Sequence, residues 1–224
     1  MVKQTLLEVC CPSEKSVLLA AAAKVERIEL CEDLSCGGVT PSDTLLELAL
    51  QQNFRTHVLV RPRGGDFVYN EAEIEAHCTS IRKVLQMGAQ GVVVGAAQAN
   101  QALDLVAMKR FKEAAGEHTI YCHRVFDAVP DKAKSLQELI HLGYDGVLTS
   151  GGEGKAIEYT DSLKRLVELA PEGFCILIGG GVRAENFLEL QRLTNGKAFH
   201  SAVGDENDTF AYQNALEALK QNLL

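Results

Sequence analysis

Two short segments near the start of the chain carry the same motif, a glutamate followed two residues later by a cysteine. The motif comprises Glu8 and Cys10 in the first segment and Glu29 and Cys31 in the second. In an extended strand alternate side chains point the same way, so each glutamate shares a face with its cysteine. The residues between them are apolar and suit burial under helices. Four such groups that point into one enclosed space indicate a chemical site.

The two cysteines have the character of soft metal ligands. Backbones of neighbouring strands lie about 4.8 Å apart, so the thiolates of Cys10 and Cys31 could hold one ion between them. Thiolates select monovalent copper, and no Cys-x-x-Cys pair indicates zinc. We therefore predict Cys10 and Cys31 as ligands of monovalent copper, with Cys36 in the following loop as a further candidate. The alternative is that the thiols pack as small buried hydrophobic groups, which is common for free cysteine.

The two glutamates need positive partners if both are to stay ionised. Neighbouring carboxylates repel one another and are pushed towards protonation. Arg61 and His123 are expected to point inwards from two later strands, where they could hold Glu8 and Glu29 ionised. The alternative is a closed ion-pair cluster that fills the interior and binds nothing, although buried ion pairs are poor stabilising devices.

His123 is also a candidate for proton transfer. It begins the segment His-Arg-Val-Phe-Asp, which ends at Asp127, and histidine is the side chain that exchanges protons near neutral pH. We predict an acid–base group that consists of Glu8, Glu29, His123 and Asp127.

A second motif suits the binding of an anion. The run Arg-Pro-Arg-Gly-Gly-Asp-Phe places Arg61 and Arg63 where a strand leads into a glycine loop. Guanidinium groups bind carboxylate or phosphate with two hydrogen bonds, although Asp66 could instead pair with one arginine and fasten the loop. Later strand ends offer further hydroxyl, imidazole and backbone groups. The predicted anion site takes from these Thr149, Ser150, Gly179, Gly180, Gly181, His200 and Ser201.

Strand and helix patterns alternate along the whole chain. The predicted strands are Leu6–Cys10, Arg27–Cys31, Thr56–Pro62, Gly91–Ala96, Thr119–Phe126, Gly146–Ser150, Phe174–Gly179 and Lys197–Ala202. Eight units of about 28 residues favour a compact (β/α)8 TIM barrel, for which roughly 250 residues is typical, as a single domain over residues 1–224. An open doubly wound sheet is the alternative, but the first strand does not lead into a Gly-x-Gly-x-x-Gly turn.

Two helix starts are marked by capping residues. Thr40 followed by Pro41 predicts an N-cap with proline at the first helical position. Asn70 and Glu73 have the spacing of a capping box, which opens a helix that is expected to end at Gly88.

Composition limits the partners that the protein can have. The net charge of −8 argues against nucleic acid or an anionic membrane, and no apolar run approaches the roughly 20 residues that span a bilayer. The seven cysteines are an odd number in a chain large enough to need no disulfide framework. We therefore expect free thiols in a reducing cytoplasm, with no signal peptide at the start.

The ordered motifs resemble the CutC copper-homeostasis family. They are Leu-Glu-Val-Cys, Arg-Ile-Glu-Leu-Cys, Arg-Pro-Arg-Gly-Gly-Asp-Phe, His-Arg-x-Phe-Asp, Val-Leu-Thr-Ser-Gly and Gly-Gly-Gly-Val, and the resemblance runs from Leu6 to Val203. It implies a cytoplasmic (β/α)8 barrel that handles copper and forms a homo-oligomer, with Cys10 and Cys31 carrying the copper.

Three functions remain open from the sequence. The first is a protein that binds monovalent copper through the two cysteines. The second is an enzyme that acts on a small phosphorylated or carboxylated metabolite, using the predicted anion site and acid–base group. The third is a scaffold whose charges at the strand ends are structural.

Overall fold

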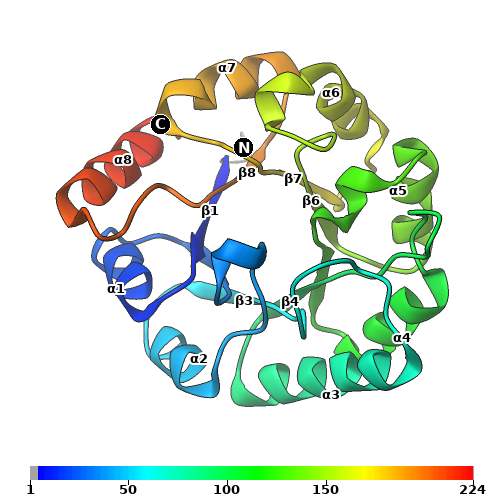
Figure 1. Ribbon diagram of the computed structural model, residues 1–224. Helices are drawn as coiled ribbons and strands as arrows, with labels where there is room; N and C mark the ends of the chain where they lie inside the picture. Colours follow the sequence, from blue (N-terminus) through cyan, green and yellow to red (C-terminus); the bar gives the residue numbers. More distant parts are fainter. Residues whose placement is uncertain (1–4, 224) are drawn as a thin grey trace.

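The strands close into a barrel. The computed structural model describes residues 5–223, and its eight parallel strands follow one another around the barrel in chain order (Figure 1). The strands are β1 (Leu6–Cys11), β2 (Arg27–Leu30), β3 (Arg55–Leu59), β4 (Gly91–Val94), β5 (Thr119–Cys122), β6 (Gly146–Thr149), β7 (Cys175–Ile178) and β8 (Ala198–Ser201). Because β8 pairs with β1, the sheet has no open edge, and the predicted (β/α)8 TIM barrel is confirmed.

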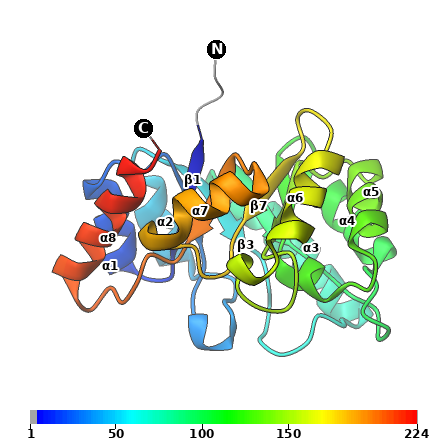
Figure 2. The same ribbon diagram turned by 90° about the horizontal axis from the view of Figure 1, so that it is seen from above.

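A ring of helices surrounds the barrel (Figures 1 and 2). These helices are α1 (Glu14–Ala22), α2 (Asp43–Leu50), α3 (Glu71–Met87), α4 (Leu105–Ala115), α5 (Lys132–His141), α6 (Thr160–Leu169), α7 (Ala184–Thr194) and α8 (Thr209–Gln221). Short 3₁₀ helices follow three of the strands: η1 (Leu34–Cys36), η2 (Arg124–Ala128) and η3 (Ala156–Glu158). The helices cover the outward faces of the strands and leave the ends of the barrel to the loops.

The alternation of side chains along each strand separates two apolar regions. Outward residues such as Val9 and Ile28 pack with the helices in one large cluster. The smaller cluster fills the barrel and consists of Cys10, Cys31, Leu59, Val93, Tyr121, Leu148, Leu177 and Ala198. The two cysteines of the repeated motif therefore lie inside the barrel, on the side that strand parity predicts.

The capping box at the start of α3 is confirmed, whereas the predicted cap of α2 is wrong. Asn70 Oδ1 accepts the Glu73 N–H at 3.0 Å, Glu73 Oε2 accepts the Asn70 N–H at 2.9 Å, and the helix ends at Gly88. In α2 the N-cap is Ser42, whose side chain accepts the Leu45 N–H, whereas the Thr40 hydroxyl is bonded to the backbone of Arg61.

Seven of the eight strands end earlier than the sequence predicts, and the difference is largest for β3 and β5. β3 ends at Leu59 instead of Pro62, and β5 ends at Cys122 instead of Phe126. After β5 the chain turns into η2, because His123 Nδ1 accepts the Val125 N–H at 3.0 Å and caps that turn. Beyond these strand ends the two-residue alternation no longer fixes the direction of a side chain.

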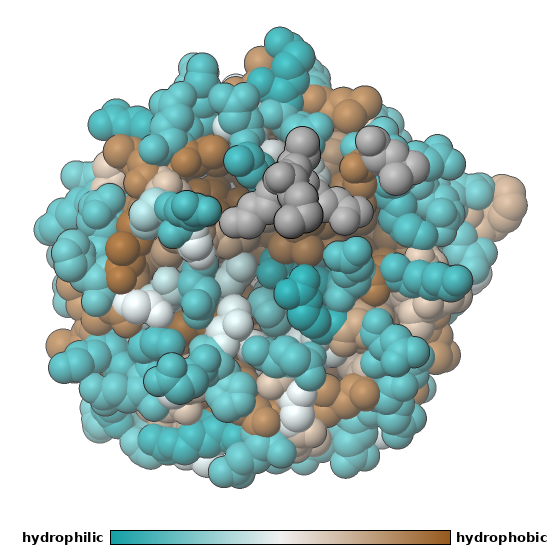
Figure 3. Space-filling model, turned by 180° about the vertical axis from the view of Figure 1, so that it is seen from behind, coloured by the Kyte–Doolittle hydropathy of each residue, from teal (hydrophilic) through white to brown (hydrophobic). Residues whose placement is uncertain are grey.

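The loops that follow the strands gather on one side of the barrel. Figure 2 shows the segments after β2 and β3 projecting on the side away from the start of β1. Barrels of this kind build their ligand sites at this end. Figure 3 shows the opposite face, where hydrophilic side chains are widespread and apolar areas lie between them. Within residues 5–223, the helices are too short or too polar to cross a bilayer.

A glycine inside the barrel gives a test of this packing. A Cβ atom at Gly146 of β6 would lie 2.6 Å from the carbonyl oxygen of Cys175 and 2.9 Å from the Tyr121 ring. We expect Gly146→Ala to lower the free energy of unfolding by about 1–3 kcal/mol, because the clash is with backbone of the neighbouring strand. Urea unfolding measures this change.

The matched control is Gly204→Ala, because no atom lies within 4 Å of the Cβ position at Gly204. We expect that variant to change the free energy of unfolding by less than about 0.5 kcal/mol. Equal stabilities of the two variants would contradict the packing described for the barrel interior.

Candidate functional site

The register of β8, β1 and β2 brings the charged groups of the site to one level. Glu8 of β1 lies opposite Arg27 of β2 on one side and His200 of β8 on the other. Cys10, two residues further along β1, lies opposite Glu29. The parallel pairing therefore places a layer of charge directly beneath the first thiol.

The two thiols meet inside the barrel. The Sγ atoms of Cys10 and Cys31 lie 3.6 Å apart, and both residues are buried. Cys31 lies just beyond β2, where its N–H donates to the Cys11 carbonyl at 3.2 Å. The neighbouring Cys31 thiol and burial raise the pKa of Cys10 well above its ordinary value. All seven cysteines of the chain are free, so the close pair is a pair of thiols.

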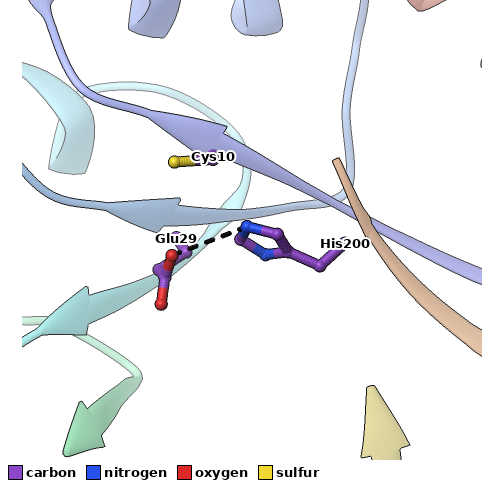
Figure 4. Close-up of side chains that lie close together, drawn as sticks. All are labelled: Cys10, Glu29 and His200. Carbon is purple, nitrogen blue, oxygen red and sulfur yellow. Dashed lines mark ion pairs between the residues drawn. The ribbon is translucent and has the colours of Figure 1, made fainter. Parts of the chain in front are cut away.

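Glu29 and His200 complete a group of potential metal ligands with Cys10. A ligand atom from each of these three residues lies within 4.8 Å of the other two, and all three are buried. Figure 4 shows the three side chains lying close together, from β1, β2 and β8. The sequence places His200 in the anion site, whereas in the structure its two ring nitrogens face the carboxylates of Glu8 and Glu29.

Glu8 is a fully buried carboxylate with two cationic partners. Its Oε2 lies 2.7 Å from Arg27 Nε, and its Oε1 lies 2.8 Å from His200 Nδ1. Burial raises the pKa of Glu8, but the hydrogen bond to His200 and the charge of Arg27 outweigh burial and lower the pKa to about 2. Glu8, Arg27 and His200 therefore form a buried ion-pair cluster.

Glu29 shares His200 with Glu8 but has a different charge balance. Burial raises its pKa to about 7, and His200, with Nε2 at 3.7 Å from Glu29 Oε2, offsets only part of this effect. Burial lowers the pKa of His200, but contacts with Cys10, Glu8 and Glu29 outweigh burial and hold it well above the ordinary value. The two glutamates of the repeated motif thus differ in pKa because of their surroundings alone.

The predicted counter-ions of the two glutamates, Arg61 and His123, are wrong. Arg61 donates to three backbone carbonyls of the neighbouring loops at 2.7 to 2.9 Å, and His123 caps η2. Both residues lie beyond the ends of their strands, so strand parity does not aim them at the glutamates. Arg27 and His200 supply the positive charge instead.

Two residues of the charged layer, Arg27 and His57, are absent from the prediction. Arg27 pairs with Glu8 as described, and His57 Nδ1 lies 3.7 Å from Glu8 Oε2. Burial lowers the pKa of His57 to about 4, so its ring is neutral near pH 7. Each has the parity of an inward residue of its own strand, Arg27 with Glu29 and His57 with Leu59. The alternation of side chains could therefore have identified both.

Asp127 is bound to residues that the sequence assigns to other roles. Its Oδ1 accepts the Thr149 hydroxyl at 2.6 Å, and its Oδ2 accepts the Ser150 hydroxyl at 2.7 Å and Arg124 Nε at 2.6 Å. These bonds tie η2 to the end of β6. The arrangement favours a structural role for Asp127, Thr149 and Ser150 over the predicted proton transfer and anion binding.

Two further members of the predicted anion site are bonded within the protein. Arg63 Nε lies 2.6 Å from Glu73, and Arg63 Nη1 lies 3.2 Å from Asp66. This is the fastened loop that the sequence leaves as an alternative. The Ser201 hydroxyl donates to the Val182 carbonyl at 2.7 Å. Neither Arg63 nor Ser201 has its polar group free for an anion.

A cavity of about 260 Å³ lies at the mouth of the barrel. Its polar lining comes from Cys10, Glu29, Cys31, Arg61, His123, Arg124, Gly180, Gly181, Arg183 and His200. Gly179, in contrast, donates its N–H to the Thr149 carbonyl at 2.9 Å and continues the pairing of β7. The cavity therefore joins the predicted copper ligands to part of the predicted anion site.

The fold and the mouth define a class of protein, a (β/α)8 barrel with clustered thiol, carboxylate and imidazole groups at its strand ends. The sequence model of the CutC family matches residues 5–205. A CutC family protein of Caulobacter vibrioides is 39% identical over 201 residues, which cover 90% of this chain and 82% of that protein. A relative from Mesorhizobium japonicum is 38% identical over 211 residues, covering 93% and 82%. The chain belongs to the CutC family.

Solved structures agree with this assignment. A structure from Streptococcus agalactiae that carries the name copper homeostasis protein CutC has a TM-score of 0.84 and 31% sequence identity. The match covers 88% of this chain and 98% of that one. An aldolase named QR15 matches with a TM-score of 0.69 at 14% identity, which shows a shared barrel fold alone.

The Arg27–Glu8 pair gives a prediction for stability. Removing one partner of a buried ion pair leaves the other charge uncompensated, so we expect Arg27→Met to lower the free energy of unfolding by about 3 kcal/mol or more. The matched control is Lys83→Met, which removes the cation of the exposed pair with Asp43 and should cost less than about 1 kcal/mol. Equal losses in urea unfolding would show that the buried pair does not stabilise the barrel.

The buried ring of His123 predicts a pH dependence. Burial and the charge of Arg61 lower the pKa of His123 from 6.5 to about 3. The folded chain therefore binds fewer protons than the unfolded chain, so this contribution to stability is present above pH 6.5 and is lost as the pH falls towards 3. Between pH 6.5 and 4.5 the loss amounts to about 2 kcal/mol.

His123→Asn should remove that part of the pH dependence, because asparagine retains an oxygen that can cap η2 and does not titrate. Urea unfolding of both proteins at the two pH values measures the difference. The interpretation fails if the variant loses as much stability on acidification as the parent protein does.

Proposed function

We propose that this protein binds monovalent copper at the mouth of its barrel, with Cys10 and Cys31 as the principal ligands. The observation that carries the proposal is the 3.6 Å separation of two buried, free sulfur atoms. Soft thiolate ligands favour monovalent copper over hard cations such as magnesium or calcium. The name of the related Streptococcus agalactiae protein, which refers to copper homeostasis, supports the same function.

His200 is the third candidate ligand. Its Nδ1 is held by Glu8 at 2.8 Å, and its Nε2 is on the side of Glu29 and Cys10. Histidines that bind metals commonly have the other ring nitrogen held by a carboxylate, which fixes the orientation of the ring. Glu8 would serve as that carboxylate, and Arg27 holds Glu8 in place. The proposed ligand set is therefore two thiolates and one imidazole, with Glu29 beside them.

The chemistry of the thiols also bears on the compartment. Seven free cysteines suit a reducing environment, so we place the protein in the cytoplasm. The charge of −8 makes nucleic acid and anionic membranes poor partners. Formation of a homo-oligomer stays a prediction, which sedimentation equilibrium of the purified chain would test.

Copper titration tests the proposed site. The reduced protein is titrated with monovalent copper against a competing chelator, beside the double variant Cys10→Ser/Cys31→Ser. Loss of residues that only orient a metal ligand costs about 10–100-fold in affinity, so loss of both thiolates should cost more than about 100-fold.

The matched control for this titration is Cys122→Ser. Cys122 is equally buried but packs in the outer cluster, on the helix side of β5. We expect this variant to bind copper as the parent protein does. Equal affinity for copper in the parent protein and the double variant would contradict the proposal.

A further inference from the structure

Arg61 is a buried cation without a carboxylate partner among residues 5–223. The residue is 5% exposed, and its Nη atoms donate to the backbone carbonyls of Cys36, Gly38 and Gly65. Carbonyl oxygens solvate a guanidinium but do not neutralise it. A charge taken out of water is normally paired, as Arg27 is with Glu8. An anion from outside the chain would neutralise the unpaired charge of Arg61.

His123 adds a buried donor that has no acceptor. Its Nδ1 accepts the Val125 N–H at 3.0 Å, so the proton of the neutral ring is on Nε2. Within the described part of the chain, neither His123 Nε2 nor Arg61 Nε has a hydrogen-bond partner, although both atoms are shielded from solvent. Buried N–H groups without acceptors are rare in folded proteins.

One aromatic ring holds the two donors in place. The guanidinium carbon of Arg61 lies 4.8 Å from the centroid of the Phe67 ring, and the centroid of the His123 ring lies 4.7 Å from the same ring. All three side chains line the cavity at the mouth of the barrel. The two residues that carry the unpartnered donors therefore belong to one wall of one cavity.

The charge of the cavity is opposite to that of the protein. Its lining includes Arg61, Arg183 and Arg124, of which Arg124 is paired with Asp127, and Glu29 is the only carboxylate that the described residues contribute to it. The chain as a whole has a net charge of −8. A basic cavity in an acidic protein attracts small anions selectively, because the remaining surface repels them.

We propose that Arg61 and His123 form a binding site for the carboxylate or phosphate group of a small organic anion, separate from the copper ligands. Guanidinium and imidazole N–H groups are matched to such oxygens. The cavity volume of about 260 Å³ limits the ligand to a metabolite of a few carbon atoms. Because Cys10 and Cys31 line the same cavity, a bound anion would lie next to the thiols.

The test uses inorganic phosphate and succinate as separate probes. Each is titrated into the reduced, metal-free protein by calorimetry, at constant ionic strength. We expect saturable binding of at least one probe, and the tighter one identifies the preferred group. His123→Asn removes the Nε2 donor but retains an acceptor for the cap of η2, and it should weaken binding about tenfold or more. Arg61→Met should weaken it further.

Arg63→Met is the matched control, because this neighbouring guanidinium is paired with Glu73 and does not line the cavity. It should bind the probes as the parent protein does. Absence of saturable binding by both probes would overturn the proposal, and so would unchanged affinity in His123→Asn. Either outcome would leave the copper proposal standing, because copper binding is assigned to the two thiols, which His123→Asn retains. The two proposals can therefore fail separately. If Arg61→Met does not fold, His123→Asn decides the question alone.

Discussion

The burial of one carboxylate organises the mouth of this barrel. Glu8 has no exposed surface and stays ionised because Arg27 and His200 reach it from the two neighbouring strands. Those partners are available because parallel pairing sets Glu8 level with both of them. The ion pairs fix the His200 ring, and the ring then presents its second nitrogen to Glu29 and Cys10. The layer of charge supports the layer of potential metal ligands above it.

The same mouth holds two kinds of chemistry on different strands. The thiols and His200 come from β1, β8 and the end of β2, where Glu8 pairs with Arg27 and His200. Arg61 and His123 follow β3 and β5, where a guanidinium has only backbone carbonyls around it. The group that contains the thiols suits a soft cation, and the group formed by Arg61 and His123 suits an oxyanion. Both groups line one cavity, so a ligand bound at one group changes the surroundings of the other.

Strand parity explains what the sequence predicted well. Eight alternating units indicated the barrel, and the alternation in β1 and β2 placed Cys10 and Cys31 in its interior. The same rule could have found Arg27 and His57, which share the inward parity of Glu29 and Leu59 on their own strands. Side-chain direction is predictable wherever a residue lies within a regular strand.

The rest of the site could not be read from parity, because it lies where the strands have ended. Arg61 and His123 were predicted to pair with the glutamates, but a loop and a 3₁₀ turn direct them elsewhere. The partners of Asp127 depend on contacts between η2 and β6, residues more than twenty positions apart. Contacts of this kind depend on how the loops pack against the barrel, and a local sequence pattern does not predict that packing.

The central claim is that the two inward thiols are the copper ligands, and X-ray absorption at the copper edge tests it most directly. The reduced protein, loaded with one equivalent of monovalent copper, should give a first shell dominated by sulfur, with two sulfur atoms and one lighter nitrogen neighbour. A first shell made only of nitrogen and oxygen would contradict the account.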